Sequence, residues 1–147
     1  MNISVSTQNA LVLAGRVMIA LLFLPAGLRK LTNFGATSAY IASKGVPLPE
    51  LCAALAVGVE VGAPLLLLLG WNTRWAALAA AIFVAVITPI FHNYWAVPEV
   101  QMLQQQTAFF KNVGIVGGLL VLIGFGPGGW SLDARGGVQG AGMPARA

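Results

Sequence analysis

Long apolar blocks alternate with short polar segments along the chain. The blocks cover residues 11–28, 51–70, 75–91 and 107–125, and each holds at most one charged side chain. A helix crosses the hydrocarbon core, about 30 Å thick, with about 20 apolar residues. Apolar and polar positions do not alternate in the short segments typical of membrane strands, and backbone groups in lipid must be paired internally. The pattern therefore predicts spanning helices at about 10–31, 50–70, 74–92 and 107–126.

The connections between the blocks predict an all-α integral membrane protein, an antiparallel four-helix transmembrane bundle formed by residues 1–133. Residues 71–73 leave room only for a tight hairpin. Residues 29–50, with several Gly and Pro, are expected to form loops and turns. Residues 92–106 form a polar, Gln-rich connection, and 134–147 a disordered Gly- and Ala-rich tail. No Lys or Arg precedes Arg16, so the first helix is expected to be retained and not cleaved as a signal peptide.

Aromatic residues support this topology, because Trp and Tyr collect at both membrane interfaces. Trp71, Trp75 and Trp130 fall at one predicted face, and Tyr40, Tyr94 and Trp95 at the other. Both termini should lie on the face of the Trp71 hairpin. The basic residues at the two faces are equal in number, so the positive-inside count does not orient the protein: they are Arg29, Lys30 and Lys44 against Arg74, Arg135 and Arg146.

The composition excludes several classes of function. The 147 residues are 58% hydrophobic and 8% charged, whereas a soluble domain carries about 25% charged residues. The scattered Lys and Arg form no basic stripe for nucleic acid. Cys52 is the single cysteine and His92 the single histidine, so we expect no disulfide, metal, haem or flavin site within the chain. The lipid bilayer is the first partner that the sequence predicts.

Charged residues inside the predicted spans are the main functional candidates, because an ionisable group in the bilayer costs at least about 2.5–3.5 kcal/mol and tends to find a partner. Counted from the face of the termini, Arg16 and Glu60 lie at similar depths, about 12 and 15 Å. Their helices are antiparallel neighbours. The sequence therefore predicts a buried Arg16–Glu60 ion pair, with a structural or a functional role equally open.

A second cluster is expected at the opposite face. Arg16, Phe23, Gly27 and Lys30 share one stripe of the first helix. Lys30, His92, Lys111 and Asn112 are then placed to ring the mouth of the bundle, with Glu60 deeper. Such a mouth suits an anion or a quinone head group, since it offers several hydrogen-bond donors and a histidine, a residue type that can exchange protons. The alternative is that the lysines only snorkel to the interface.

Gly114 and Gly118 form a G-x-x-x-G pattern on the face of Lys111. Small residues at this spacing allow close helix packing. We expect that packing to occur within the chain, in preference to dimerisation.

The ordered motifs of the chain resemble the DoxX family of small bacterial membrane proteins. They are Arg16 followed by residues 23–31 (FLPAGLRKL), then Glu60-Val61-Gly62, Thr73-Arg74, His92, Lys111-Asn112, and residues 126–128 with 131–133. The similarity runs from about Leu11 to Asp133. Pro25 departs from the first motif. The resemblance implies a multi-pass protein of the bacterial inner membrane, linked in some members to quinone-coupled redox chemistry or to protection against catechol and quinone stress.

Carried to this chain, the resemblance makes Glu60 and His92 the candidate catalytic residues. Arg16, Lys30, Lys111 and Asn112 are the candidates for binding a quinone. Because the sequence encodes no electron carrier, electrons would come from the substrate or from a soluble or membrane redox partner, and the chain would be at most a subunit of a quinone-linked oxidoreductase. The alternatives left open are a noncatalytic membrane anchor or assembly partner of a redox complex, and a small-solute transporter. The sequence leaves the oligomeric state open.

Overall fold

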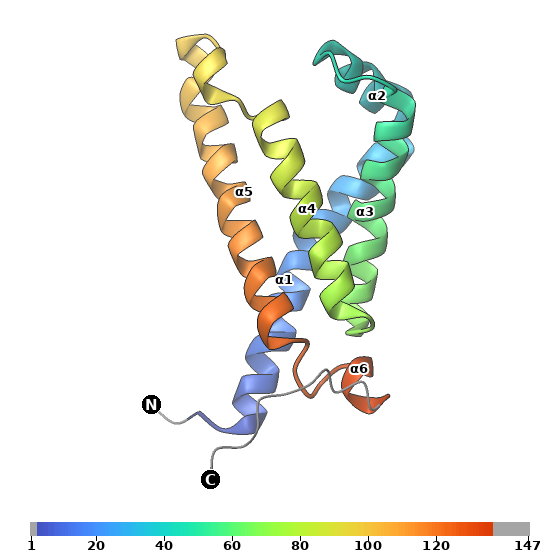
Figure 1. Cartoon of the computed structure of the whole chain (residues 1–147), viewed down its shortest axis with the longest axis vertical. Helices are drawn as coiled ribbons and strands as arrows, with labels where there is room; N and C mark the ends of the chain where they lie inside the picture. Colours follow the sequence, from blue (N-terminus) through green and yellow to red (C-terminus); the bar gives the residue numbers. More distant parts are fainter. Residues whose placement is uncertain (1–2, 137–147) are drawn as a thin grey trace.

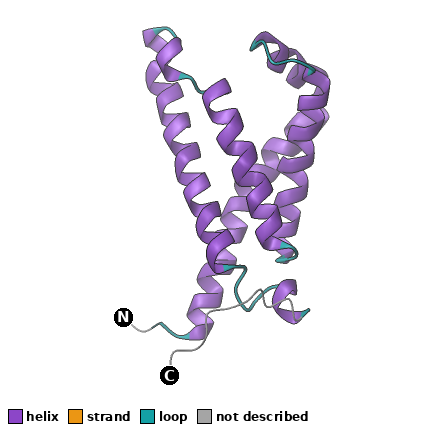
Figure 2. Ribbon diagram, viewed as in Figure 1, coloured by secondary structure: helices purple, strands orange, loops and turns teal. Residues whose placement is uncertain are grey.

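The computed structural model describes residues 3–136, and within these it is helical without strands (Figure 2). Four long helices have the length and composition to cross a membrane, which confirms the predicted all-α membrane bundle. The elements in chain order are α1 (Val5–Thr32), α2 (Phe34–Ser43), α3 (Pro49–Leu69), α4 (Thr73–Phe91), a 3-10 turn η1 (Tyr94–Ala96), α5 (Glu99–Phe125) and α6 (Leu132–Arg135).

Several boundaries differ from the sequence-based expectation, beginning with the first helix, which starts at Val5 and not near residue 10. The segment predicted as loop between the first two spans contains the helix α2. The last long helix begins at Glu99 and not near residue 107, so much of the Gln-rich connection is helical. Ala134 and Arg135, predicted to belong to the tail, lie in α6, and residues 137–147 lie outside the described residues.

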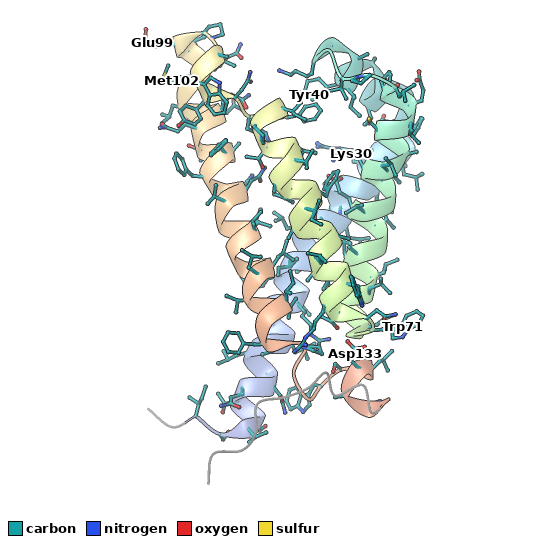
Figure 3. The ribbon with its side chains drawn as sticks, in the orientation of Figure 1. Lys30, Tyr40, Trp71, Glu99, Met102 and Asp133 are labelled. Atoms are coloured by element: carbon teal, nitrogen blue, oxygen red, sulfur yellow. The ribbon has the colours of Figure 1, made fainter. Side chains whose placement is uncertain are left out.

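The two ends of the described chain lie on the same side as the α3–α4 hairpin (Figure 1). We call this side the terminal face and the other side the open face. Trp71 lies at the terminal face and Tyr40 at the open face (Figure 3), and both side chains are exposed. This arrangement confirms the predicted topology and the placement of these two aromatic residues.

The helices pack most tightly near the terminal face. Four alanines of α4 are buried there against Leu67 of α3 and Leu119 and Leu122 of α5. Small side chains on α4 let both neighbouring helices approach closely. Toward the open face α4 and α5 diverge from α1, α2 and α3, so that the bundle opens like a V (Figure 1). The four alanines are Ala76, Ala77, Ala80 and Ala81.

The predicted packing role of the G-x-x-x-G pattern on α5 is wrong for the described chain. A Cβ atom placed on Gly114 or Gly118 would meet nothing within 4 Å. The helix α5 packs mainly on α4 and η1, and its glycines face away from the neighbouring helices.

Candidate functional site

A cavity of about 860 Å³ lies in the open half of the bundle, between α1, α2, α3 and α4. Its α3 wall includes Cys52, Ala56 and Glu60, which follow one another at four-residue steps and therefore share a face of the helix. From Cys52 to Glu60 this wall runs about 12 Å along the helix axis. Glu60 thus lies at the inner end of the cavity, near the middle of the span.

The α4 wall of the cavity is apolar. Phe83, Val86, Ile87 and Ile90 line it, and Leu55 of α3 adds to the apolar surface. Such walls suit a hydrocarbon or an aromatic ring, because apolar surface gains about 25 cal/mol per Å² when it leaves water. The polar groups are concentrated at the inner end and at the mouth.

The inner end carries an ion pair between α1 and α3. Lys30 Nζ donates to Glu60 Oε2 at 2.5 Å. The Glu60 side chain is 6% exposed and the Lys30 side chain 28%, so the carboxylate is embedded and the ammonium is reachable from the cavity. Both residues line the cavity.

Gly27 explains how α1 and α3 come close enough for this pair. An added Cβ at Gly27 would lie 2.9 Å from the backbone carbonyl carbon and oxygen and from the Cβ of Glu60. The two helices therefore cross at Gly27 and Glu60. Lys30 lies about 4.5 Å further along α1, and its flexible side chain reaches back to the carboxylate.

The mouth of the cavity is polar and aromatic. Tyr40 of α2 and Phe91 of α4 line it and contact each other, with ring centroids 5.6 Å apart. His92 follows α4, and its Nδ1 lies 2.9 Å from Gln105 Oε1 of α5. Asn33 and Thr37 complete the polar rim on the α2 side.

The predicted Arg16–Glu60 ion pair is wrong. Arg16 is buried near the terminal face, where its guanidinium donates to the backbone carbonyls of Leu67 (3.3 Å) and Trp130. The first turns of α1 extend past the α3–α4 hairpin (Figure 1). Arg16 therefore lies level with the end of α3, and not level with Glu60.

The structure brings together three of the six predicted site residues. Lys30, Glu60 and His92 line the cavity. Lys111 is exposed on α5, and Asn112 donates to Thr88 Oγ1 at 3.1 Å in the α4–α5 contact. Neither of the two α5 residues lines the cavity, so the predicted ring of four polar residues at the mouth is not formed in the described structure.

Sequence reasoning missed the contribution of α2 to the site. Ala36, Thr37, Tyr40 and Ile41 line the cavity, but their segment was expected to be a loop. The repeat of Cys52, Ala56 and Glu60 could have indicated the α3 wall, since it marks one helical face that carries a charge. In the described residues, no group of His, Cys, Asp or Glu is arranged to hold a metal ion.

Comparison with known proteins gives consistent matches. A family model described as DoxX matches residues 11–93. The inner membrane protein YphA of Escherichia coli K12 is 38% identical over 130 residues, which cover 88% of this chain and 93% of YphA. The inner membrane protein YqjF of the same organism is 34% identical over 122 residues, covering 83% of this chain and 88% of YqjF.

A more distant match extends beyond bacteria. The Surfeit locus protein 4 homolog of Drosophila melanogaster is 30% identical over 133 residues, which cover 86% of this chain and 41% of that protein. No solved structure matches the chain significantly. The two inner-membrane relatives and the four spanning helices confirm the predicted location, a multi-pass protein of the bacterial inner membrane.

Proposed function

The chain belongs to the DoxX family of membrane proteins, and from this premise we propose that it binds a quinone-type head group in the cavity between α1, α2, α3 and α4, as a subunit of quinone-linked redox chemistry. The observation that carries the proposal is the cavity itself. It combines apolar walls with a part-buried ion pair, Lys30–Glu60, at its inner end. Ligand sites are typically apolar pockets of 300–1,000 Å³ with a few polar groups that orient the ligand.

Each polar residue has a role in this proposal. Lys30 donates to an oxygen of the head group and stabilises negative charge that develops there. Glu60 takes up or releases a proton at the inner end, and His92 exchanges protons at the mouth. Electrons come from a redox partner or from the substrate. Arg16, Lys111 and Asn112, expected from the sequence to bind the head group, have no part in this cavity.

The test is equilibrium binding of 2-tert-butyl-1,4-benzoquinone and its hydroquinone to the purified protein in nanodiscs. We expect saturable binding of at least one redox form, weakened at least tenfold by Val86→Trp, which fills the cavity. Val121→Trp is the matched control, because Val86 and Val121 are 55% and 59% exposed and Val121 lies on α5, outside the cavity. No binding of either form to intact protein would overturn the proposal.

The second candidate function is a noncatalytic anchor or assembly partner of a redox complex. The exposed face of α5 favours it: α5 buries only Leu119 and Leu122, and the space beside Gly114 and Gly118 is open. Substitutions Gly114→Leu and Gly118→Leu test this candidate. They should release a co-purifying membrane partner while binding in the cavity is retained; an unchanged set of partners argues against it.

A further inference from the structure

At the inner end of the cavity, one carboxylate oxygen of Glu60 is a free hydrogen-bond acceptor within the described structure, and it lies beside the Lys30 ammonium, which has free N–H donors. Lys30 occupies Oε2 of Glu60, whereas Oε1 accepts no hydrogen bond from the described part of the chain. The fully buried side-chain atoms without a partner, among residues 3–136, are Arg16 Nε and Thr73 Oγ1. Oε1 is not one of them, so we infer that it is reachable from the cavity that Glu60 lines.

Lys30 completes the arrangement. Its ammonium has three N–H donors, and among residues 3–136 only one of them has a partner, in the bond to Glu60. A ligand atom beside the pair therefore meets a carboxylate oxygen that can only accept and an ammonium that can only donate. The two atoms of the pair are 2.5 Å apart, so a single ligand oxygen can contact both residues.

We propose that the Lys30–Glu60 pair selects a ring hydroxyl, and hence the reduced, quinol form of the ligand over the quinone. A hydroxyl donates to Glu60 Oε1 and accepts from Lys30 Nζ, which leaves the ion pair intact. A quinone carbonyl accepts from Lys30 but offers no proton to Oε1, and its oxygen then lies against an unpaired carboxylate lone pair. A site that hydrogen-bonds a hydroxyl discriminates strongly against an analogue without it.

This inference rests on the proposed function, because it concerns the ligand of the same cavity. The proposed function requires only that the cavity binds the quinone or the quinol, whereas this inference requires that it prefers the quinol. The embedding of Glu60 supports the selectivity, since an unmatched acceptor costs most where water is excluded. At the mouth, where Tyr40 is 51% exposed, water can complete the hydrogen bonds of either form.

Three ligands with one skeleton test the inference on the unaltered protein: tert-butylhydroquinone, its dimethyl ether, and tert-butyl-1,4-benzoquinone. The dimethyl ether keeps the two acceptor oxygens and lacks the two hydroxyl donors. Unlike the quinone, it is not an electrophile. We expect the hydroquinone to bind at least tenfold more tightly than both other compounds in nanodiscs. Equal affinity for the three compounds would overturn the selectivity but leave the proposed function standing. If neither the hydroquinone nor the quinone binds, the selectivity and the proposed function are both overturned.

A variant then assigns the selectivity to Glu60. In Glu60→Gln the side chain offers a donor as well as an acceptor, so the preference for the hydroquinone over the ether should fall to within about threefold. Glu50→Gln is the control, because Glu50 is an exposed acid of α3 that does not line the cavity. A preference that persists in Glu60→Gln would contradict the assignment. If Glu60→Gln does not fold, the three-ligand comparison still decides the inference.

Discussion

At the scale of single residues, the site depends on a close approach that only a glycine allows. Gly27 faces the backbone of Glu60 with no room for a Cβ. Its neighbour on the same stripe, Lys30, is thereby brought within reach of the carboxylate. The sequence does place Phe23, Gly27 and Lys30 on one stripe, and the structure confirms that Phe23 and Gly27 face the bundle interior.

Gly27→Ala should destabilise the protein and separate Lys30 from Glu60. The added methyl group would meet backbone atoms, which cannot move aside as a flexible side chain does. Overpacking of this kind costs about 1–3 kcal/mol, measurable as a lower midpoint of thermal unfolding in detergent. Gly15→Ala on the same helix is the control, since its Cβ meets nothing within 4 Å. Equal midpoints for the two variants would contradict the close contact.

The error in pairing Arg16 with Glu60 also belongs to this scale. The predicted depth of Arg16, about 12 Å from the face of the termini, places the start of the first helix level with the hairpin, but α1 begins at Val5 and its first turns extend past the hairpin (Figure 1). A hydropathy pattern indicates which residues lie in the membrane, but it does not determine the axial position of one helix relative to its neighbour. The axial position follows from side-chain contacts, here from Arg16 to the carbonyls of Leu67 and Trp130.

At the scale of elements, the sequence predicts the four spans well because each must be apolar and long. It predicts the connecting helices poorly. The helix α2 follows Asn33 and contains Gly35, which favour turns, and its few buried side chains, Ser38 and Ile41, acquire meaning only through tertiary packing. The cavity wall that α2 supplies was therefore not predictable from the local pattern.

The start of α4 shows the same dependence on distant residues. Its N-cap, Asn72, makes no side-chain capping bond. Instead, Asp133 of α6 accepts from the backbone N–H groups of Asn72 (2.8 Å) and Thr73 (3.0 Å). The N–H of Asp133 in turn donates to the carbonyl of Gly70. A carboxylate at a helix N-terminus is favourable both as a hydrogen-bond acceptor and toward the helix dipole.

Asp133→Ala should therefore loosen the beginning of α4. We expect a loss of about 0.5–2 kcal/mol, the usual cost of removing an N-cap, and faster hydrogen exchange at the amides of Asn72 and Thr73. Glu50→Ala is the control, since Glu50 lies in the first turn of α3 but has no side-chain hydrogen bond among the described residues. Unchanged exchange at both amides in Asp133→Ala would show that the cap contributes nothing.

At the scale of the whole molecule, the two faces of the bundle differ in kind. At the terminal face, Arg16 and α6 are hydrogen-bonded to the end of α3 and to the hairpin, whereas the cavity lies toward the open face. The cavity should therefore be accessible from one side of the membrane only, and that side is opposite to the N-terminus. The single cysteine of the chain, Cys52, lines the cavity and is free, so it reports this access without competing thiols.

A membrane-impermeant maleimide should label Cys52 in sealed vesicles only when it is added on the side opposite an N-terminal tag, whose position protease digestion reveals. The control is Trp71→Cys in a Cys52→Ala background, because Trp71 lies in the hairpin at the terminal face and is 53% exposed. That cysteine should be labelled only from the side of the tag. Labelling of Cys52 from the tag side would contradict a one-sided cavity. We also expect tert-butylhydroquinone to slow the labelling of Cys52. This result would indicate that the maleimide and the ligand enter the same cavity from the same side of the membrane.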